Sequence, residues 1–300
     1  MDINFEYYKI FYFVARYKNI TKAAMALGSN QPNVTRIMKL LESQLDCRLF
    51  VREARGVSLT EEGKKLYSHV EVAYRHLLSA QEEISSYAAA GVGTVEIGAT
   101  ESALHLFLLE AMGEFKVRYP KIRIKVHNHA TPEILKYLAS GKLDFAVITT
   151  PFEVPKSFCC EKLFVFRELL VGGTQYNYLS GKKMRLDKLL DCPWVGLGNG
   201  TATYEFYKKL FREHNAEIEL DMEVATSDLV MPLICNNLGI GFVPEKLALP
   251  LLKEKKLVQI ELDCNIPCRA IELVSGRGGS MAADIFYKYI LEQSVVADAC

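Results

Sequence analysis

The 300-residue sequence predicts a multidomain α+β protein, and three patterns along the chain support that fold class. About 60 N-terminal residues have the pattern of short helices followed by a hairpin. A long heptad repeat follows, and strands then alternate with helices to the end of the chain. Half of the residues are hydrophobic, and 36 basic side chains balance 36 acidic ones. A chain of this length and composition fits two or three soluble folding units with full cores.

The N-terminal part contains two helices joined by a short turn. Thr21 is a suitable N-cap for a helix over residues 22–27, because its hydroxyl can accept from a free backbone N–H. Gly28, Ser29 and Asn30 have turn chemistry. Pro32 lies just inside the next helix, residues 31–45, where its missing N–H costs nothing. This geometry is typical of a helix-turn-helix, although other small helical domains share it.

The second of these helices has one apolar and one polar side. The apolar positions recur at helical spacing and should face a core: Val34, Ile37, Met38, Leu41 and Leu45. A preceding helix offers a similar apolar stripe: Tyr8, Phe11, Val14 and Ala15. The polar positions lie near the opposite side or the exposed N-terminal end, where a helix-turn-helix contacts DNA: Gln31, Pro32, Thr35, Arg36 and Lys39.

An arginine-rich hairpin follows. Residues 48–60 alternate, with Arg52 and Arg55 close to Gly56, which indicates a two-stranded wing. Arginine suits a narrow minor groove or a phosphate. Residues 16–65 contain ten Lys/Arg and five Asp/Glu, although the whole chain is neutral. A local excess of positive charge is a modest indication of nucleic-acid binding.

A seven-residue repeat predicts one long helix after the hairpin. Its narrow apolar seam consists of Gly63, Leu66, Val70, Ala73, Leu77, Ala80, Ile84 and Tyr87. A helix of about 27 residues is roughly 40 Å long. Such a seam normally meets another helix, although packing on the same domain is an alternative. Residues 88–93, with two glycines, should end the helix and form a hinge.

Residues 94–293 alternate between strands and helices, which indicates an α/β fold with buried, mostly parallel strands. The expected strands are 94–99, 122–128, 143–149, 163–173, 194–197, 218–224, 240–243 and 268–274. The expected helices are 103–119, 132–140, 204–214, 228–236 and 280–293.

The N-terminal sequence resembles that of LysR-type transcriptional regulators. The positions that carry the resemblance are Phe11, Ala15, Thr21, Ala23, Ala24, Leu27, Gln31, Pro32, Val34, Thr35, Ile37, Leu40, Glu42, Leu45, Leu49, Phe50, Arg52, Leu59, Thr60 and Gly63. Thr35 replaces the usual serine but keeps the hydroxyl. Asp46 replaces the usual glycine but tolerates a left-handed turn. Similar phrases at Val95–Gly98, Tyr119–Pro120, Gly141–Asp144 and Leu238–Pro244 resemble the family's effector domain.

The resemblance implies a winged helix-turn-helix over residues 1–60 and a linker and dimerisation helix over 61–92. It implies a two-lobed effector domain like a periplasmic binding protein, with lobe I at 93–161 plus 269–300 and lobe II at 162–268. The implied function is ligand-responsive, sequence-specific regulation of transcription. The implied partners are double-stranded DNA, a small effector, RNA polymerase and further copies of the chain, as a dimer and a tetramer.

Ligands of α/β sheets bind beyond the carboxyl ends of strands, beside helix N-termini. The candidate effector residues at such positions are Thr100, Glu101, Ser102, Thr149, Thr150, Asn199, Thr201, Thr203 and Thr226. Hydroxyls and free N–H groups suit an anion. Glu101 would repel an anion unless turned away, whereas a zwitterionic or amine ligand would use it. Ordinary N-capping is the alternative role for each Ser and Thr.

No catalytic or metal motif appears, so we expect neither an enzyme nor a cofactor. His127 and His129 lie two apart on one predicted strand, a spacing more typical of a cleft or surface than of a metal site. A free-standing solute-binding module is a competing class, but it would lack the N-terminal unit. The N-terminus has no secretory pattern and no apolar run approaches the ~20 residues of a membrane span, so we expect a cytoplasmic protein.

The eight cysteines show no paired C-x-x-C spacing, and we expect free, mostly buried thiols. The alternative is an oxidant-sensing cysteine, which would need an electropositive setting.

Overall fold

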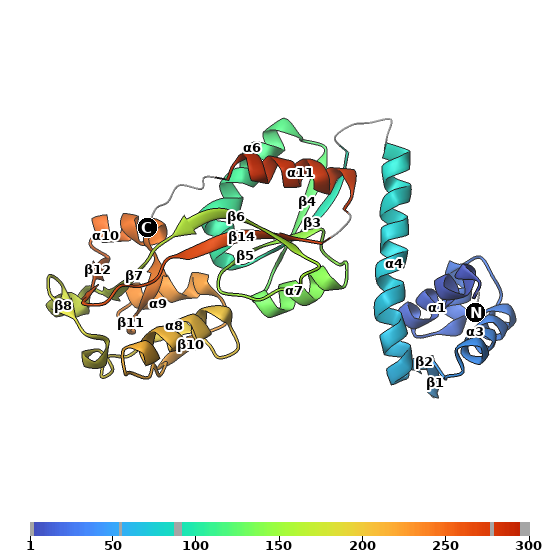
Figure 1. Cartoon of the computed structure of the whole chain (residues 1–300), viewed down its shortest axis with the longest axis horizontal. Helices are drawn as coiled ribbons and strands as arrows, with labels where there is room; N and C mark the ends of the chain where they lie inside the picture. The colour runs from blue at the N-terminus through green and yellow to red at the C-terminus, as the bar shows by residue number, and fades with distance from the viewer. Residues whose placement is uncertain (1–2, 54–55, 87–91, 277–278, 295–300) are drawn as a thin grey trace. The chain divides into compact units, whose positions relative to one another are not determined.

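The protein is described by a computed structural model that covers residues 3–53, 56–86, 92–276 and 279–294 (Figure 1). The chain divides into two compact units, residues 1–85 and residues 86–300. Each unit has a hydrophobic core of its own.

The N-terminal unit begins with three helices: α1 (Phe5–Tyr17), α2 (Ile20–Ala26) and α3 (Gln31–Leu45). The predicted apolar side of α3 is confirmed, because Val34, Ile37, Met38 and Leu41 are buried. The predicted cap of α2 is wrong. Asn19 caps this helix instead, and its side chain accepts from Lys22 N–H at 3.0 Å, so Thr21 lies exposed in the first turn.

A hairpin of β1 (Phe50–Glu53) and β2 (Gly56–Leu59) follows α3 and forms the predicted wing. The carboxylate of Glu42 on α3 fixes its start, since Oε1 accepts from Leu49 N–H at 2.7 Å and Phe50 N–H at 3.2 Å. Asp46 adopts the expected left-handed conformation, with φ of 50°. The tip residue Arg55 lies outside the described residues.

The long helix α4 (Glu61–Ser86) has 26 residues. Thr60 caps it by accepting from Gly63 N–H at 2.9 Å. The first half of the seam packs on the N-terminal core through Leu66 and Val70. Further along, the seam residue Leu77 is 52% exposed. Tyr87 and most of the predicted hinge lie outside the described residues.

The C-terminal unit contains a five-stranded sheet in the order β4-β3-β5-β14-β6. Its strands are β3 (Gly93–Ala99), β4 (Ile122–Asn128), β5 (Phe145–Thr149), β6 (Cys159–Phe166) and β14 (Arg269–Ser275). Two helices cover one face of this sheet. One is α11 (Met281–Glu292). The other is continuous and consists of α5 (Glu101–Ala103), a π-helical turn (Leu104–Leu108) and α6 (Leu109–Arg118). On the other face lies α7 (Thr131–Ala139), as Figure 1 shows.

A second group of strands forms the other lobe of this unit. Strand β7 (Glu168–Gly173) lies between β11 (Ile240–Pro244) and β12 (Leu257–Gln259). Two further pairs are β9 (Val195–Leu197) with β10 (Met222–Val224), and β8 (Lys183–Met184) with β13 (Glu261–Leu262). The helices that cover them are α8 (Ala202–Glu213), α9 (Val230–Cys235) and α10 (Glu245–Lys253).

The expectation of mostly parallel strands is wrong. Among the described residues of this unit, four strand pairings are parallel and four are antiparallel. Two of the antiparallel pairings involve β14, which returns between the lobes in the direction opposite to β6 and pairs with β5 and β6. The other two join β7 to β11 and β12. The single strand expected over 163–173 likewise divides at Arg167 into β6 and β7.

A buried ion pair lies where the chain passes between the lobes. Arg269 begins β14 and Glu168 begins β7, and their side chains approach to 3.4 Å while only 1% and 5% exposed. The guanidinium also donates to the carbonyl of Thr150 at 2.7 Å. Its Nη2 donates to the hydroxyls of Thr149 at 3.3 Å, in lobe I, and Thr203 at 3.0 Å, in lobe II. One side chain therefore joins both lobes.

Replacing Gly63 by alanine tests the close approach of α4 to the wing. An added Cβ would overlap the carbonyl oxygen of Leu49, so Gly63→Ala should lower the free energy of unfolding by about 1 kcal/mol or more. Helix propensity alone favours alanine by about 1 kcal/mol. Gly113→Ala in α6 is the matched control, because its Cβ would meet nothing within 4 Å and should stabilise. Thermal denaturation measures both, and equal stabilisation would contradict the packing.

Replacing Glu168 by leucine tests the buried ion pair. The change strands the Arg269 charge in the interior and should cost about 3–5 kcal/mol in urea denaturation. The double variant Glu168→Leu/Arg269→Met should regain part of this loss, because it leaves no unpaired charge. Asp187→Leu, which breaks the exposed pair with Arg185, should cost only about 0–1 kcal/mol. A Glu168→Leu protein as stable as this control would refute the assignment.

Candidate functional site

The first turns of α3 present a polar surface, which we call the α3 face: Gln31, Pro32, Thr35, Arg36 and Lys39. These five predicted residues line one shallow depression together with Leu40. Asn30 caps the helix by accepting from Asn33 N–H at 2.9 Å, and Pro32 occupies the first turn, so the helix starts where the prediction placed it.

Hydrogen bonds within the α3 face orient its side chains. Gln31 Nε2 donates to Thr35 Oγ1 at 3.1 Å, and Arg36 Nη2 donates to Asn33 Oδ1 at 3.1 Å. Neither Arg36 nor Lys39 has a carboxylate partner among the described residues. Arg52 is exposed on β1. Unpaired cations beside amide and hydroxyl groups are what contacts to phosphates and base edges require.

The C-terminal unit holds a cavity of about 320 Å³ between its lobes, which we call the cleft cavity. The parallel strands end at one edge of the lobe I sheet, where Ala99 lies opposite Asn128 and Val147. The four predicted loops converge at this edge. Seven of the nine candidate effector residues line the cavity: Thr100, Glu101, Ser102, Thr149, Thr201, Thr203 and Thr226.

The other two candidates are not among the lining residues. The hydroxyl of Thr150 accepts from Ala270 N–H at 2.9 Å, so this side chain is engaged with β14. Thr149 and Thr150 are consecutive, and consecutive residues of an extended chain point to opposite sides. Asn199 is exposed beyond β9.

The N-capping alternative holds at one position and fails at two. Thr201 caps α8 by accepting from Tyr204 N–H at 3.1 Å. Thr100 and Thr226 occupy cap positions but make no side-chain cap bond. The buried hydroxyl of Thr100, which lines the cleft cavity, has no hydrogen-bond partner among the described residues.

The candidate effector residues left out a fifth loop, which follows β4, although the spacing of His127 and His129 had indicated a cleft or a surface. Asn128, His129, Thr131 and Glu133 also line the cleft cavity. The strand-end rule applied to β4 would have found Asn128. His129 Nδ1 lies 3.4 Å from Glu133 Oε2, and His127 Nε2 lies 2.7 Å from Glu96 Oε2. The described residues include no group of three or more His, Cys, Asp or Glu that could hold a metal ion.

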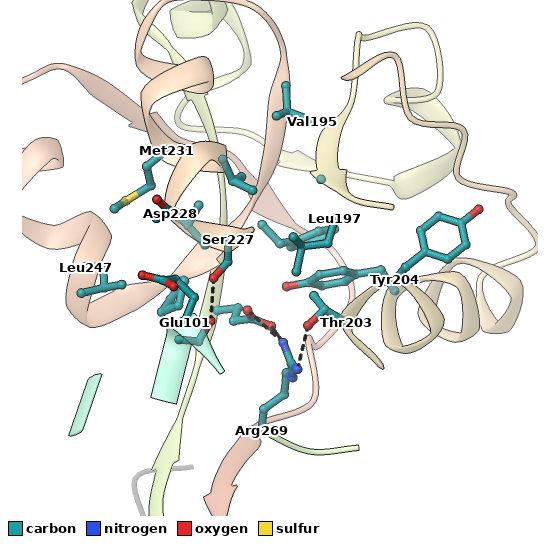
Figure 2. Close-up of a pocket in the computed structure, with 18 of the residues that line it drawn as sticks. Glu101, Val195, Leu197, Thr203, Tyr204, Ser227, Asp228, Met231, Leu247 and Arg269 are labelled. Atoms are coloured by element: carbon teal, nitrogen blue, oxygen red, sulfur yellow. Dashed lines mark hydrogen bonds and ion pairs between the residues drawn. The ribbon is translucent and has the colours of Figure 1, made fainter. Parts of the chain in front are cut away.

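A smaller cavity of about 200 Å³ adjoins the cleft cavity, and we call it the side chamber (Figure 2). Both are lined by Glu101, Ser102, Leu197, Thr203 and Ser227. Ser102 and Ser227 face each other across the lobes with their hydroxyl oxygens 3.3 Å apart. The ion pair of Glu168 and Arg269 lies at the edge of the side chamber.

The cysteines differ from the expectation of free, mostly buried thiols. Of the six free cysteines described, Cys159 and Cys160 are exposed and the others half-buried. Cys268 is disulfide-bonded. Partial burial, the largest cause, raises the pKa of four thiols, which disfavours the reactive thiolate: Cys160, Cys192, Cys235 and Cys264.

Within the described ranges, no helix combines the length and the apolar character that crossing a bilayer requires.

Sequence comparisons place both units in one family. Residues 5–64 match the bacterial regulatory helix-turn-helix protein, lysR family, and residues 88–294 match the LysR substrate binding domain. The HTH-type transcriptional regulator YvbU of Bacillus subtilis (strain 168) is 26% identical over 95% of this chain and 96% of its own. The RuBisCO operon transcriptional regulator of Allochromatium vinosum is 24% identical over 98% and 97%.

Solved structures share the fold over the full chain. ArgP from Mycobacterium tuberculosis has a TM-score of 0.76 at 17% identity, covering 98% of each chain. LysG from Corynebacterium glutamicum, solved with bound effector Arg, has a TM-score of 0.71 at 15% identity, covering 97% of this chain and 98% of its own. The chain belongs to the LysR family of transcriptional regulators, with an N-terminal DNA-binding helix-turn-helix domain and a C-terminal effector-binding domain.

Proposed function

We propose that this regulator reads DNA through the α3 face and is controlled by a small effector bound in the cleft cavity. The observation that carries the proposal is the α3 face itself, where two cations without carboxylate partners among the described residues lie beside exposed amide and hydroxyl groups. The proposed domains are residues 1–60, the linker helix 61–92, lobe I at 93–161 plus 269–300, and lobe II at 162–268. The proposed place of action is the cytoplasm, where the DNA is.

Each DNA-binding residue has a proposed role. Gln31, Pro32, Thr35 and Arg36 lie near base edges, and Lys39 contacts a phosphate. Thr21, exposed in the first turn of α2, is a further candidate for a backbone contact. Arg52 and Arg55 of the wing grip the backbone and the minor groove.

Self-association is proposed through α4. A groove of about 570 Å³ runs between α1 and α4, lined by Phe5, Leu66, Val70, Ala73, Leu77 and Leu78 among others. Leu77 is 52% and Phe5 72% exposed. An apolar face of this kind is typical of an interface, and pairing of two such helices gives a dimer. A tetramer built as a dimer of dimers and a contact with RNA polymerase complete the proposed assembly.

The proposed effector is a small anionic or zwitterionic metabolite. The hydroxyls and free N–H groups of the cleft cavity suit a carboxylate, whereas Glu101 suits an amine. LysG was solved with arginine as its bound effector, and CbnR was solved in complex with its target DNA. In this chain, effector binding would shift the two lobes and, through the linker helices, the spacing of the DNA-binding heads.

The first test measures DNA binding by gel shift across salt concentrations. Arg52→Ala should weaken binding to all sequences alike and reduce the salt slope by about 1. Thr35→Ala should instead change which sequence is preferred, by about 1–3 kcal/mol at one position. Arg185→Ala is the control, because Arg185 is exposed in the other unit. Equal losses on every sequence for both variants would refute the division of roles.

The second test identifies the effector. Native mass spectrometry of the purified protein should reveal a carried-over small molecule, and adding it should raise the melting temperature by mass action. Thr226→Val should lower this response without unfolding the protein, because Thr226 makes no side-chain cap bond. A full response in this variant would contradict the proposed site.

A further inference from the structure

We infer that the side chamber selects effectors that carry a primary amine on a compact apolar group, about the size of one ring. The inference rests on the proposed function and narrows its effector class, because it excludes purely anionic metabolites and keeps those that carry an amine. Four properties of the side chamber carry it: its size, its walls, its charge and one buried hydroxyl.

The size of the chamber limits the group that enters. Its volume is about 200 Å³. An engineered apolar cavity of ~150 Å³ holds a benzene molecule. A single six-membered ring or a branched aliphatic chain therefore fills this space, whereas a fused ring system needs more.

The walls of the chamber are apolar over most of their area. Leu220, Met231, Phe242 and Leu247 come from four different parts of the chain and surround the space together with Trp194 and Leu197. Figure 2 shows Met231 and Leu247 on one side of the pocket and Leu197 on the other. Walls of this kind favour burial of a hydrocarbon group at about 25 cal/mol per Å².

The charges at the chamber oppose an anion. Glu101, Glu168 and Asp228 all line it, whereas Arg269 is its one lysine or arginine among the described residues. Glu168 and three threonine oxygens already occupy the Arg269 guanidinium. The Glu101 carboxylate lies 2.9 Å from the imidazole of His105 and forms no pair with a lysine or arginine of the described chain. Glu101 and Asp228 therefore remain to attract an ammonium group and repel a carboxylate.

A buried phenol gives independent support for an occupant. Tyr207 lines the chamber and is 8% exposed, and its hydroxyl has no hydrogen-bond partner among the described residues. Burial, and then the charge of Glu168, raises the pKa of Tyr207 well above its ordinary value, so the group stays protonated. The Glu168 carboxylate is the acceptor that acts on this phenol within the chain, and it is already engaged by Arg269. An acceptor on the occupant would therefore complete the hydrogen bonding of Tyr207.

The test is calorimetric titration of the full-length protein with three probes that share one ring: phenethylamine, phenylalanine and 3-phenylpropionate. The two amines should bind. The anion 3-phenylpropionate should bind at least about tenfold more weakly, because the carboxylates of Glu101 and Asp228 repel its negative charge. Glu101→Gln and Asp228→Asn should each weaken phenethylamine by about tenfold. Asp187→Asn is the matched control, since it removes a carboxylate that does not line the chamber.

Three outcomes would overturn the inference. They are preferential binding of 3-phenylpropionate, amine binding that neither acid variant weakens, and no binding of any probe. Circular dichroism of each variant excludes loss of folding as the cause. Gel shift of the unaltered protein on DNA runs in parallel, so that failure of the chamber and failure of the proposed DNA-binding function are separately visible.

Discussion

The ion pair of Glu168 with Arg269 is the constraint on which the C-terminal unit depends. Two strands carry the chain between the lobes, and the pair lies where they cross. Burying both charges is costly, and the pair is tolerated only because each nitrogen of the guanidinium donates to an oxygen. The hydrogen bonds of Arg269 to Thr149 in lobe I and Thr203 in lobe II hold the two lobes together at the cleft cavity.

The guanidinium of Arg269 connects the place where the chain passes between the lobes to the candidate effector site. Thr149 and Thr203 line the cleft cavity from opposite lobes, yet both accept hydrogen bonds from Arg269 Nη2. A ligand that displaced either hydroxyl from Arg269 would weaken one of these bonds, whereas a ligand that only accepts the hydroxyl proton would leave it in place. The proposed effector site and the contact between the lobes therefore share the guanidinium of Arg269, and a ligand that changes these hydrogen bonds would shift the lobes.

Local patterns predicted many of the helices and strands but missed α10 and the short strands β8, β12 and β13. The spacing of Val34, Ile37 and Leu41 sufficed to find the buried side of α3, because helix periodicity is a local property. Asn19 and Thr21 can both cap a helix, and Asn19 is the residue that caps α2. Which of the two does so depends on where the preceding chain turns, at Lys18. A short stretch of sequence cannot reveal the direction of a strand. It also cannot reveal the pairing of Glu168 with Arg269, which are 101 residues apart.

The division of charge between the two units gives a neutral chain two opposite electrostatic surfaces. Cations without acid partners in the described chain gather on the α3 face, whereas Glu101, Glu168 and Asp228 line the side chamber. A phosphate backbone is attracted to the first and repelled from the second. An effector that carries an amine has the opposite preference. On the proposed assignment of sites, DNA and effector bind to different surfaces, and any influence of one on the other passes through the fold.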